Sequence, residues 1–277
     1  MSKHVGYIRV LKLIIPYFFV VGLFQILGYL ILGIDIFGGE KAQSDTDFLV
    51  IQVFGLTGTV LILWLFRTKV DREKFVSLGF VGNKIWRDVL IGTFAGATII
   101  LVGFLILLWM GELRYVSFEF SISRFLTGMS LFAVVAINEE LLMRGYVLNN
   151  FLISFNKYVA LLLSALLFAM MHFSNPEYSL IAFINLFLAG VFLGLPYLFN
   201  RNLWFPIAAH FSWNFIQGTV LGFEVSGQSV SSIFRHNYEN ATIWNGGGFG
   251  FEGSLISIIL LIMSIITLHI LYKRFSD

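Results

Sequence analysis

The sequence predicts an all-α membrane protein, a polytopic transmembrane helix bundle of about eight spans. Three observations predict this fold class: 58% of the 277 residues are hydrophobic, only 12% are charged, and long apolar runs recur along the chain. A mean hydropathy of +0.86 is too high for the apolar surface to be buried in a soluble core of ordinary size. The net charge of +2 is too small to indicate a nucleic-acid partner. We therefore expect membrane lipid, and no nucleic acid, around this chain.

A run of roughly 20 apolar residues is the unit for counting helical spans. Eight runs meet or approach it: 13–33, 48–66, 89–110, 125–148, 158–171, 178–199, 203–221 and 254–271. The first exceeds the apolar core of a usual signal peptide and no small-x-small cleavage site follows it, so we expect an uncleaved span. The fifth run is short. We expect one integral membrane domain over residues 1–277, without an internal repeat.

The distribution of Lys and Arg predicts the orientation of these spans. If the N-terminus is inside, the outer side receives four of the 18 basic residues, Lys41, Arg114, Arg124 and Arg235, and the inner side receives the other 14. Such an excess marks cytoplasmic loops. We therefore expect a multi-pass protein of the cell membrane with both termini in the cytoplasm.

Charged residues inside the fourth run are the most informative feature of the sequence. Glu139, Glu140 and Arg144 lie there, and burying such charges without partners costs at least a few kcal/mol each. On a helix, Glu140 and Arg144 are i,i+4 neighbours that can pair, whereas Glu139 lies about 100° further round. Glu139 is then the carboxylate free to move a proton. The alternative is a buried structural ion cluster.

Two more polar pairs fall inside apolar runs. His172 ends the fifth run with Phe168 at i,i+4, and His210 and Asn214 are i,i+4 partners in the seventh. A rise of about 1.5 Å per residue places these residues and Glu139 near the middle of a hydrocarbon core about 30 Å thick. Three helices can therefore converge on one polar cavity. Taken alone, His172 would be interpreted as an interfacial histidine near a helix end. His210 and Asn214 alone would be interpreted as residues that form interhelical hydrogen bonds.

Two chemistries are open for such a cavity. In the first, Glu139 with His172 takes a proton from a water that attacks a peptide carbonyl, and His210 with Asn214 donates hydrogen bonds to the oxyanion. In the second, His172, His210 and a glutamate, with Glu139 as the candidate, ligate one divalent metal ion such as zinc. The chain has no cysteine, which excludes thiolate nucleophiles and thiolate ligands. The cofactor is thus either none or one divalent metal.

Three short motifs carry a family resemblance. They are E-E-x-x-x-R at residues 139–144, F-x-x-x-H at 168–172 and H-x-x-x-N at 210–214, in that order. With them the chain resembles the CPBP intramembrane proteases, also called the abortive-infection or ABI family. That family includes the Ras-converting CAAX endopeptidase of eukaryotes and bacterial bacteriocin-immunity members. The resemblance covers a catalytic core of about 125–221.

The resemblance implies a bundle of about eight transmembrane helices that encloses a polar cavity open to the cytosol. It implies an endopeptidase that, in eukaryotes, cleaves near the C-terminus of prenylated CAAX proteins. The residues that match the family's catalytic positions are Glu139, His172, His210 and Asn214, with Glu140, Arg144 and Phe168 in supporting positions. We therefore expect an intramembrane endopeptidase acting on a membrane-associated peptide or protein. The resemblance does not decide between the two chemistries.

Two functions of other classes stay open. One is a non-catalytic immunity or scaffold protein that binds a partner in the membrane. The other is a proton-coupled transporter, because intramembrane Glu and His also form proton relays. Against the transporter, the sequence contains no inverted repeat and no paired broken helices.

The sequence predicts no catalytic or binding residues in the outer loop 222–253. We expect Glu224, His236 and Glu252 to lie at a solvated surface. The glycine-rich stretch 246–250 is expected to be a flexible loop, because no helix-opening lysine motif accompanies the glycines as a phosphate cradle would require.

Overall fold

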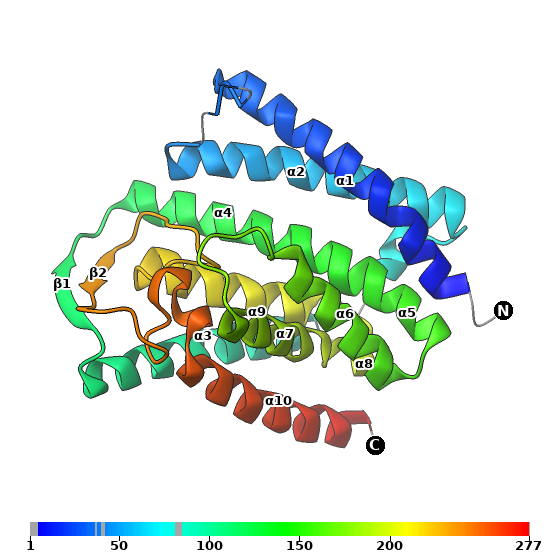
Figure 1. The fold of residues 1–277 in the computed structure, drawn as a ribbon. Helices are drawn as coiled ribbons and strands as arrows, with labels where there is room; N and C mark the ends of the chain where they lie inside the picture. The colour runs from blue at the N-terminus through cyan, green and yellow to red at the C-terminus, as the bar shows by residue number, and fades with distance from the viewer. Residues whose placement is uncertain (1–4, 37, 40–41, 81–84, 277) are drawn as a thin grey trace.

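The computed structural model describes residues 5–36, 38–39, 42–80 and 85–276. It consists mainly of helices packed side by side (Figure 1). Of the basic residues used to predict the orientation, Lys3, Lys41 and Lys84 lie outside the described residues. The start of α1 and the end of α10 lie at the end of the bundle opposite to the two strands (Figure 1).

The described elements follow the expected apolar runs. The α-helices are α1 (Val5–Leu32), α2 (Asp45–Leu65), α3 (Ile85–Met110), α4 (Ile122–Glu140), α5 (Asn149–Ser154), α6 (Lys157–Met171), α7 (Leu180–Gly194), α8 (Tyr197–Asn200), α9 (Trp204–Asn214) and α10 (Leu255–Ser276). Short 3₁₀ helices are η2 (Phe75–Leu78), η5 (Gly247–Phe249) and η6 (Phe251–Gly253).

Six helical segments of the described chain are long and apolar enough to cross a membrane: 5–32, 45–70, 85–110, 122–154, 180–200 and 255–274. The other two expected spans form helices below this length, since α6 has 15 residues and α9 has 11. The chain is thus a helical protein with six candidate spans, and the expected number of eight is not confirmed.

Helices α1 and α2 form a hairpin that lies beside α4 (Figure 1). Ser44 starts α2 with a capping box: its hydroxyl accepts from the Asp47 backbone N–H, and the Asp47 carboxylate accepts from the Ser44 N–H. Small residues let the two helices approach closely, because a Cβ at Gly58 would lie 3.2 Å from the Val21 Cα. The hairpin thereby forms one wall beside the bundle.

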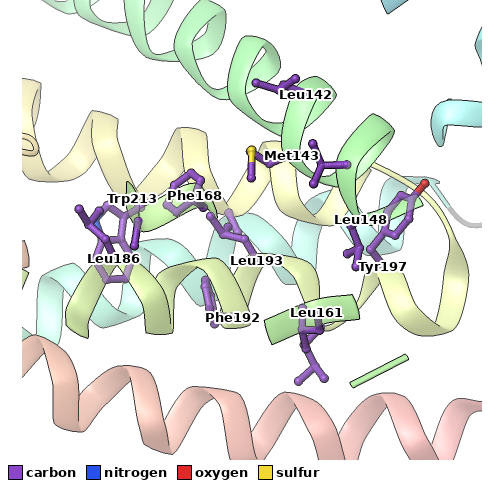
Figure 2. Packing of buried hydrophobic residues seen from close by; sticks show 14 of the residues in the cluster. Leu142, Met143, Leu148, Leu161, Phe168, Leu186, Phe192, Leu193, Tyr197 and Trp213 are labelled. Atoms are coloured by element: carbon purple, nitrogen blue, oxygen red, sulfur yellow. The ribbon is translucent and has the colours of Figure 1, made fainter. Parts of the chain in front are cut away.

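Helix α9 lies in the interior of the bundle. Gly92 and Gly96 of α3 face the backbone of α9 so closely that an added side chain would collide with the carbonyls of Phe205 and Ala209. Phe168 of α6 and Leu186, Phe192 and Leu193 of α7 form a cluster of buried apolar side chains with Trp213 of α9 (Figure 2). This burial places the polar residues of α9 in the centre of the protein.

Two helices widen into π-helical turns next to the polar residues. Helix α4 ends at Glu140 and continues as η3 (Leu141–Leu148), and α9 ends at Asn214 and continues as η4 (Phe215–Val220). A third π-helical segment, η1 (Phe66–Val70), follows α2. Such π segments are rare and occur frequently at functional sites. The apolar periodicity of the sequence does not predict these π-helical turns.

A two-stranded antiparallel sheet departs from the all-α prediction. Strand β1 (Arg114–Phe118) pairs with β2 (Phe234–Asn237), with an irregularity between Tyr115 and Ser117. The sequence analysis assigned both strands to loops. Their pairing joins segments more than a hundred residues apart, so no hairpin signal marks it.

The outer loop is packed against the bundle, which corrects the expectation for its glycine-rich part. Phe249 and Phe251 are at most 1% exposed. Gly250 has a φ of +82°, and a Cβ there would collide with the backbone of Glu224. The glycines are therefore required by tight backbone packing rather than by flexibility.

We predict that the loop around His236 loosens at acidic pH. Burial lowers the pKa of His236 below its usual value, although its Nδ1–H bond to the Leu221 carbonyl opposes this. Because the unfolded loop then binds a proton that the folded loop resists, the stabilisation holds above about pH 6.5 and is lost as the pH falls. The measurement is the protection of the amides of residues 222–238 against hydrogen exchange, relative to an unstructured chain at the same pH. His236→Phe, which keeps a ring next to Phe223, should make this protection independent of pH. Equal protection above and below about pH 6.5 in the unmodified protein would contradict the prediction.

Candidate functional site

A cavity of about 660 Å³ lies between the α1–α2 hairpin and the rest of the bundle. All four residues expected to be catalytic line it: Glu139 of α4, His172 at the end of α6, and His210 and Asn214 of α9. The structure therefore brings together side chains from three helices, as the depth estimate predicts. Most of the remaining wall is apolar, which is the usual composition of a binding cavity.

Glu139 lies between the two histidines. Its Oε2 atom is 3.8 Å from Nε2 of His172 and 3.9 Å from Nε2 of His210. Both distances exceed a direct hydrogen bond, and among the described residues this buried oxygen has no hydrogen-bond partner. At such separations a bridging water is the usual partner of polar groups. The three atoms thus surround a place where a small polar molecule can sit.

Hydrogen bonds on the far side of each ring orient the histidines. Nδ1 of His172 lies 2.9 Å from the Phe168 carbonyl oxygen, and Nδ1 of His210 lies 2.8 Å from Oε1 of Glu140. Because a carbonyl and a carboxylate only accept, we assign the proton to Nδ1 in both rings. Each Nε2 is then the nitrogen available on the Glu139 side.

Glu140 and Arg144 form the expected i,i+4 ion pair, with 2.7 Å between Nη1 and Oε1. Both side chains are buried, at most 1% exposed. Arg144 also donates from Nη2 to the Gly190 carbonyl at 3.0 Å, and its guanidinium lies 4.6 Å from the centre of the Phe168 ring. One oxygen of Glu140, Oε1, thus contacts both Nη1 of Arg144 and Nδ1 of His210.

Asn214 completes the set one helical turn beyond His210. The residue is 4% exposed and lines the cavity, and no side chain or backbone group of the described chain hydrogen-bonds to its amide. Its N–H donors are therefore available to a bound molecule.

The polar residues of the cavity that were not predicted from the sequence include Asn138 and Glu252. Asn138 lines it with a buried Oδ1 that has no partner in the described chain; its place within an apolar run next to Glu139 was a usable signal. Glu252 was expected at a solvated surface but is only 6% exposed. It accepts from Nε1 of Trp213 at 2.9 Å and from the backbone N–H and hydroxyl of Ser226 at 2.7 Å. Those partners are distant in sequence, so no local pattern marked Glu252.

The fit of a divalent metal can be judged from the same side chains. Within the part of the chain that the structure describes, no group of three or more His, Asp or Glu side chains is arranged to hold a metal ion. His172, His210 and Glu139 face one another, but at separations that a shared ion would shorten. The arrangement as it stands does not fit a metal centre.

Comparison with known proteins gives a family and no closer relative. Residues 121–216 match the family model described as type II CAAX prenyl endopeptidase Rce1-like. No curated protein and no solved structure matches the chain. The matched segment contains all three motifs and the four converging residues. This match confirms the resemblance predicted from the motifs: over residues 121–216 the chain is similar to the Rce1-like type II CAAX prenyl endopeptidases.

Proposed function

We propose that this protein is an intramembrane endopeptidase that hydrolyses a peptide bond of a membrane-associated peptide or protein. The observation that carries the proposal is the unpartnered Oε2 of Glu139, held between the Nε2 atoms of His172 and His210. A carboxylate in that position can act as a general base on a water molecule. The match of residues 121–216 to a protease family model supports the same reaction class.

Hydrolysis proceeds in two steps in this proposal. Nε2 of His172 accepts one hydrogen of the attacking water and orients it, while Glu139 takes the other as the water oxygen bonds to the peptide carbonyl carbon. The proton on Glu139 then moves to the departing amine nitrogen as the carbon–nitrogen bond breaks. The products are a carboxylic acid and an amine, so the atoms balance without a further reactant.

The developing oxyanion is stabilised by donors on α9. Asn214 and His210 both line the cavity, and in this proposal the Asn214 amide and Nε2 of His210, which carries a second proton in this step, donate hydrogen bonds to the oxyanion. Glu140 holds the opposite nitrogen of the His210 ring at 2.8 Å. Loss of one such donor typically slows an enzyme by about 10²- to 10³-fold. Phe168 and Arg144 act indirectly by holding His172 and Glu140 in place.

The topology belongs to the same proposal. We infer eight spans, with α6 and the continuous segment of α9 and η4 as the two short ones, packed beside longer helices (Figure 1). The excess of Lys and Arg at the end of the bundle that carries the termini favours both termini in the cytoplasm.

Turnover by metal-depleted protein tests the function and the mechanism together. Purified protein is treated with a chelator, its metal content is measured by elemental analysis, and hydrolysis of a quenched fluorescent peptide is followed. We expect turnover at an unchanged rate with no stoichiometric metal, because no step passes through an ion. Turnover that returns only on adding zinc contradicts the mechanism, and no hydrolysis in either state contradicts the peptidase assignment.

A further inference from the structure

The two ends of the bundle differ in charge. The end that carries the termini has these basic residues among those described: Arg9, Lys12, Arg67, Lys69, Arg72, Lys74, Arg87, Lys157, Arg201, Lys273 and Arg274. The opposite end, where β1 and β2 lie (Figure 1), has three in the described chain: Arg114, Arg124 and Arg235. Basic residues collect on the cytoplasmic side of membrane proteins. The strand end of the bundle is therefore the extracytoplasmic end.

The cavity extends from the middle of the bundle toward the strand end. Its lining includes Tyr29 near the end of α1, Phe48 near the start of α2, and Ser226 and Gln228 of the outer loop. None of the basic residues of the terminus-bearing end lines it. The lining therefore includes residues of the strand end and none of the basic residues of the opposite end.

Paired polar side chains connect the helices at the basic end. Asp71, whose side chain is fully buried, accepts from Nε of Arg9 at 3.1 Å, from Nη1 of Arg67 at 3.3 Å and from the Tyr146 hydroxyl at 3.3 Å. These residues come from α1, η1 and η3, so their bonds connect three elements at that end. A buried pair of this kind is costly to separate. No open path from the basic end to Glu139 is expected past this cluster.

The chemistry of the lining indicates what can enter. The side-chain amides of Gln25, Gln52, Asn175 and Gln228 line the cavity, and an amide both donates and accepts hydrogen bonds, as a peptide backbone does. No Lys or Arg of the described chain is part of the lining. A free C-terminal carboxylate would therefore find no cationic partner there, next to Glu139.

We propose that the cavity opens to the extracytoplasmic side and admits a neutral, extended internal segment of a peptide that reaches the membrane from that side. The clause on the substrate rests on the proposed function; the side of opening does not. The family resemblance implies an opening to the cytosol instead. The cavity extends toward the end of the bundle opposite to the termini, so cytoplasmic termini place its opening on the extracytoplasmic side.

Accessibility of introduced cysteines tests the side of opening, and the absence of native cysteine makes every variant a single-thiol protein. Gln228→Cys places the thiol at the mouth, Val135→Cys within the cavity, and Lys69→Cys at the basic end as the control. A charged, membrane-impermeant maleimide is applied to right-side-out and inside-out vesicles. We expect the first two to react only in right-side-out vesicles and Lys69→Cys only in inside-out vesicles. Reaction of Val135→Cys in inside-out vesicles, or in neither, overturns the proposal, as does the reverse pattern for Gln228→Cys and Lys69→Cys.

The substrate is tested with a quenched peptide of uncharged residues that has blocked ends, added to the same vesicles. We expect cleavage in right-side-out vesicles and loss of cleavage in inside-out vesicles, and a matched peptide with a free C-terminal carboxylate should be cleaved more slowly. Cleavage in detergent but not in right-side-out vesicles overturns the inference while the peptidase assignment stands. No cleavage in detergent overturns the peptidase assignment and leaves the labelling result to decide the side of opening.

Discussion

Replacement of Glu139 with Gln is expected to reduce peptidase turnover by about 10²- to 10⁴-fold, the usual contribution of a general base. The substitution keeps the size of the side chain and its place between the two histidines but removes the group that accepts a proton. Folding should be unaffected, because Oε2 of Glu139 has no hydrogen-bond partner within the described chain. The measurement is turnover of a quenched peptide, together with thermal unfolding of both proteins.

A matched control is Glu239→Gln, the same change at a carboxylate far from the cavity lining. Glu239 pairs with Arg114 at 2.6 Å, but both side chains are 66% exposed, and such surface pairs contribute only about 0–1 kcal/mol. This variant should retain full turnover. If Glu139→Gln also retains it, Glu139 is not the base, and the proposed mechanism fails.

Removal of the buried cation is expected to have the largest effect on stability. Arg144→Met keeps much of the side-chain length but leaves the Glu140 carboxylate buried and without its guanidinium partner. Breaking a buried pair in this way typically costs about 3–5 kcal/mol. The free energy of unfolding in detergent measures the loss. Turnover should fall as well, because Glu140 Oε1 is also the atom that holds Nδ1 of His210.

Two further variants separate charge burial from general disruption. Arg124→Met breaks an ion pair with Glu119 of 3.4 Å whose side chains are partly exposed, and it should cost about 0–1 kcal/mol. Glu140→Gln added to Arg144→Met removes the uncompensated charge, so part of the stability should return. Turnover should stay low, because His210 lacks its carboxylate. A loss for Arg144→Met no larger than that for Arg124→Met would show that the pair contributes little.

Much of the candidate site was predictable because its residues are conspicuous in an apolar chain. The cost of charge in lipid singles out Glu139, Glu140 and Arg144, and helical geometry pairs the last two, as the 2.7 Å ion pair bears out. The motif spacing predicts the family, which the match over residues 121–216 confirms. Both inferences use only local periodicity and side-chain chemistry.

Other features depend on contacts that are distant along the chain. The pairing of β1 with β2 and the burial of Glu252 beside Trp213 have no local signature. The π-helical turns after Glu140 and Asn214 depart from the α-helical periodicity that was used to predict which residues share a helix face. Gly92 and Gly96 allow α3 to approach α9 closely, but this role can be recognised only once α9 is known to be the neighbouring helix.

The residues alone predict a helical membrane protein that resembles a protease family between 121 and 216, and they single out the polar side chains that are costly to bury without partners. Hydropathy and intramembrane charge are properties of the residues themselves, so no knowledge of the packing is needed for these predictions. The packed helices were needed to show that Glu139 lies between two histidines, that Glu140 contacts Arg144 and His210, and toward which end the cavity extends. The physical reason is that distances between helices and the position of a cavity follow from packing among segments far apart in sequence.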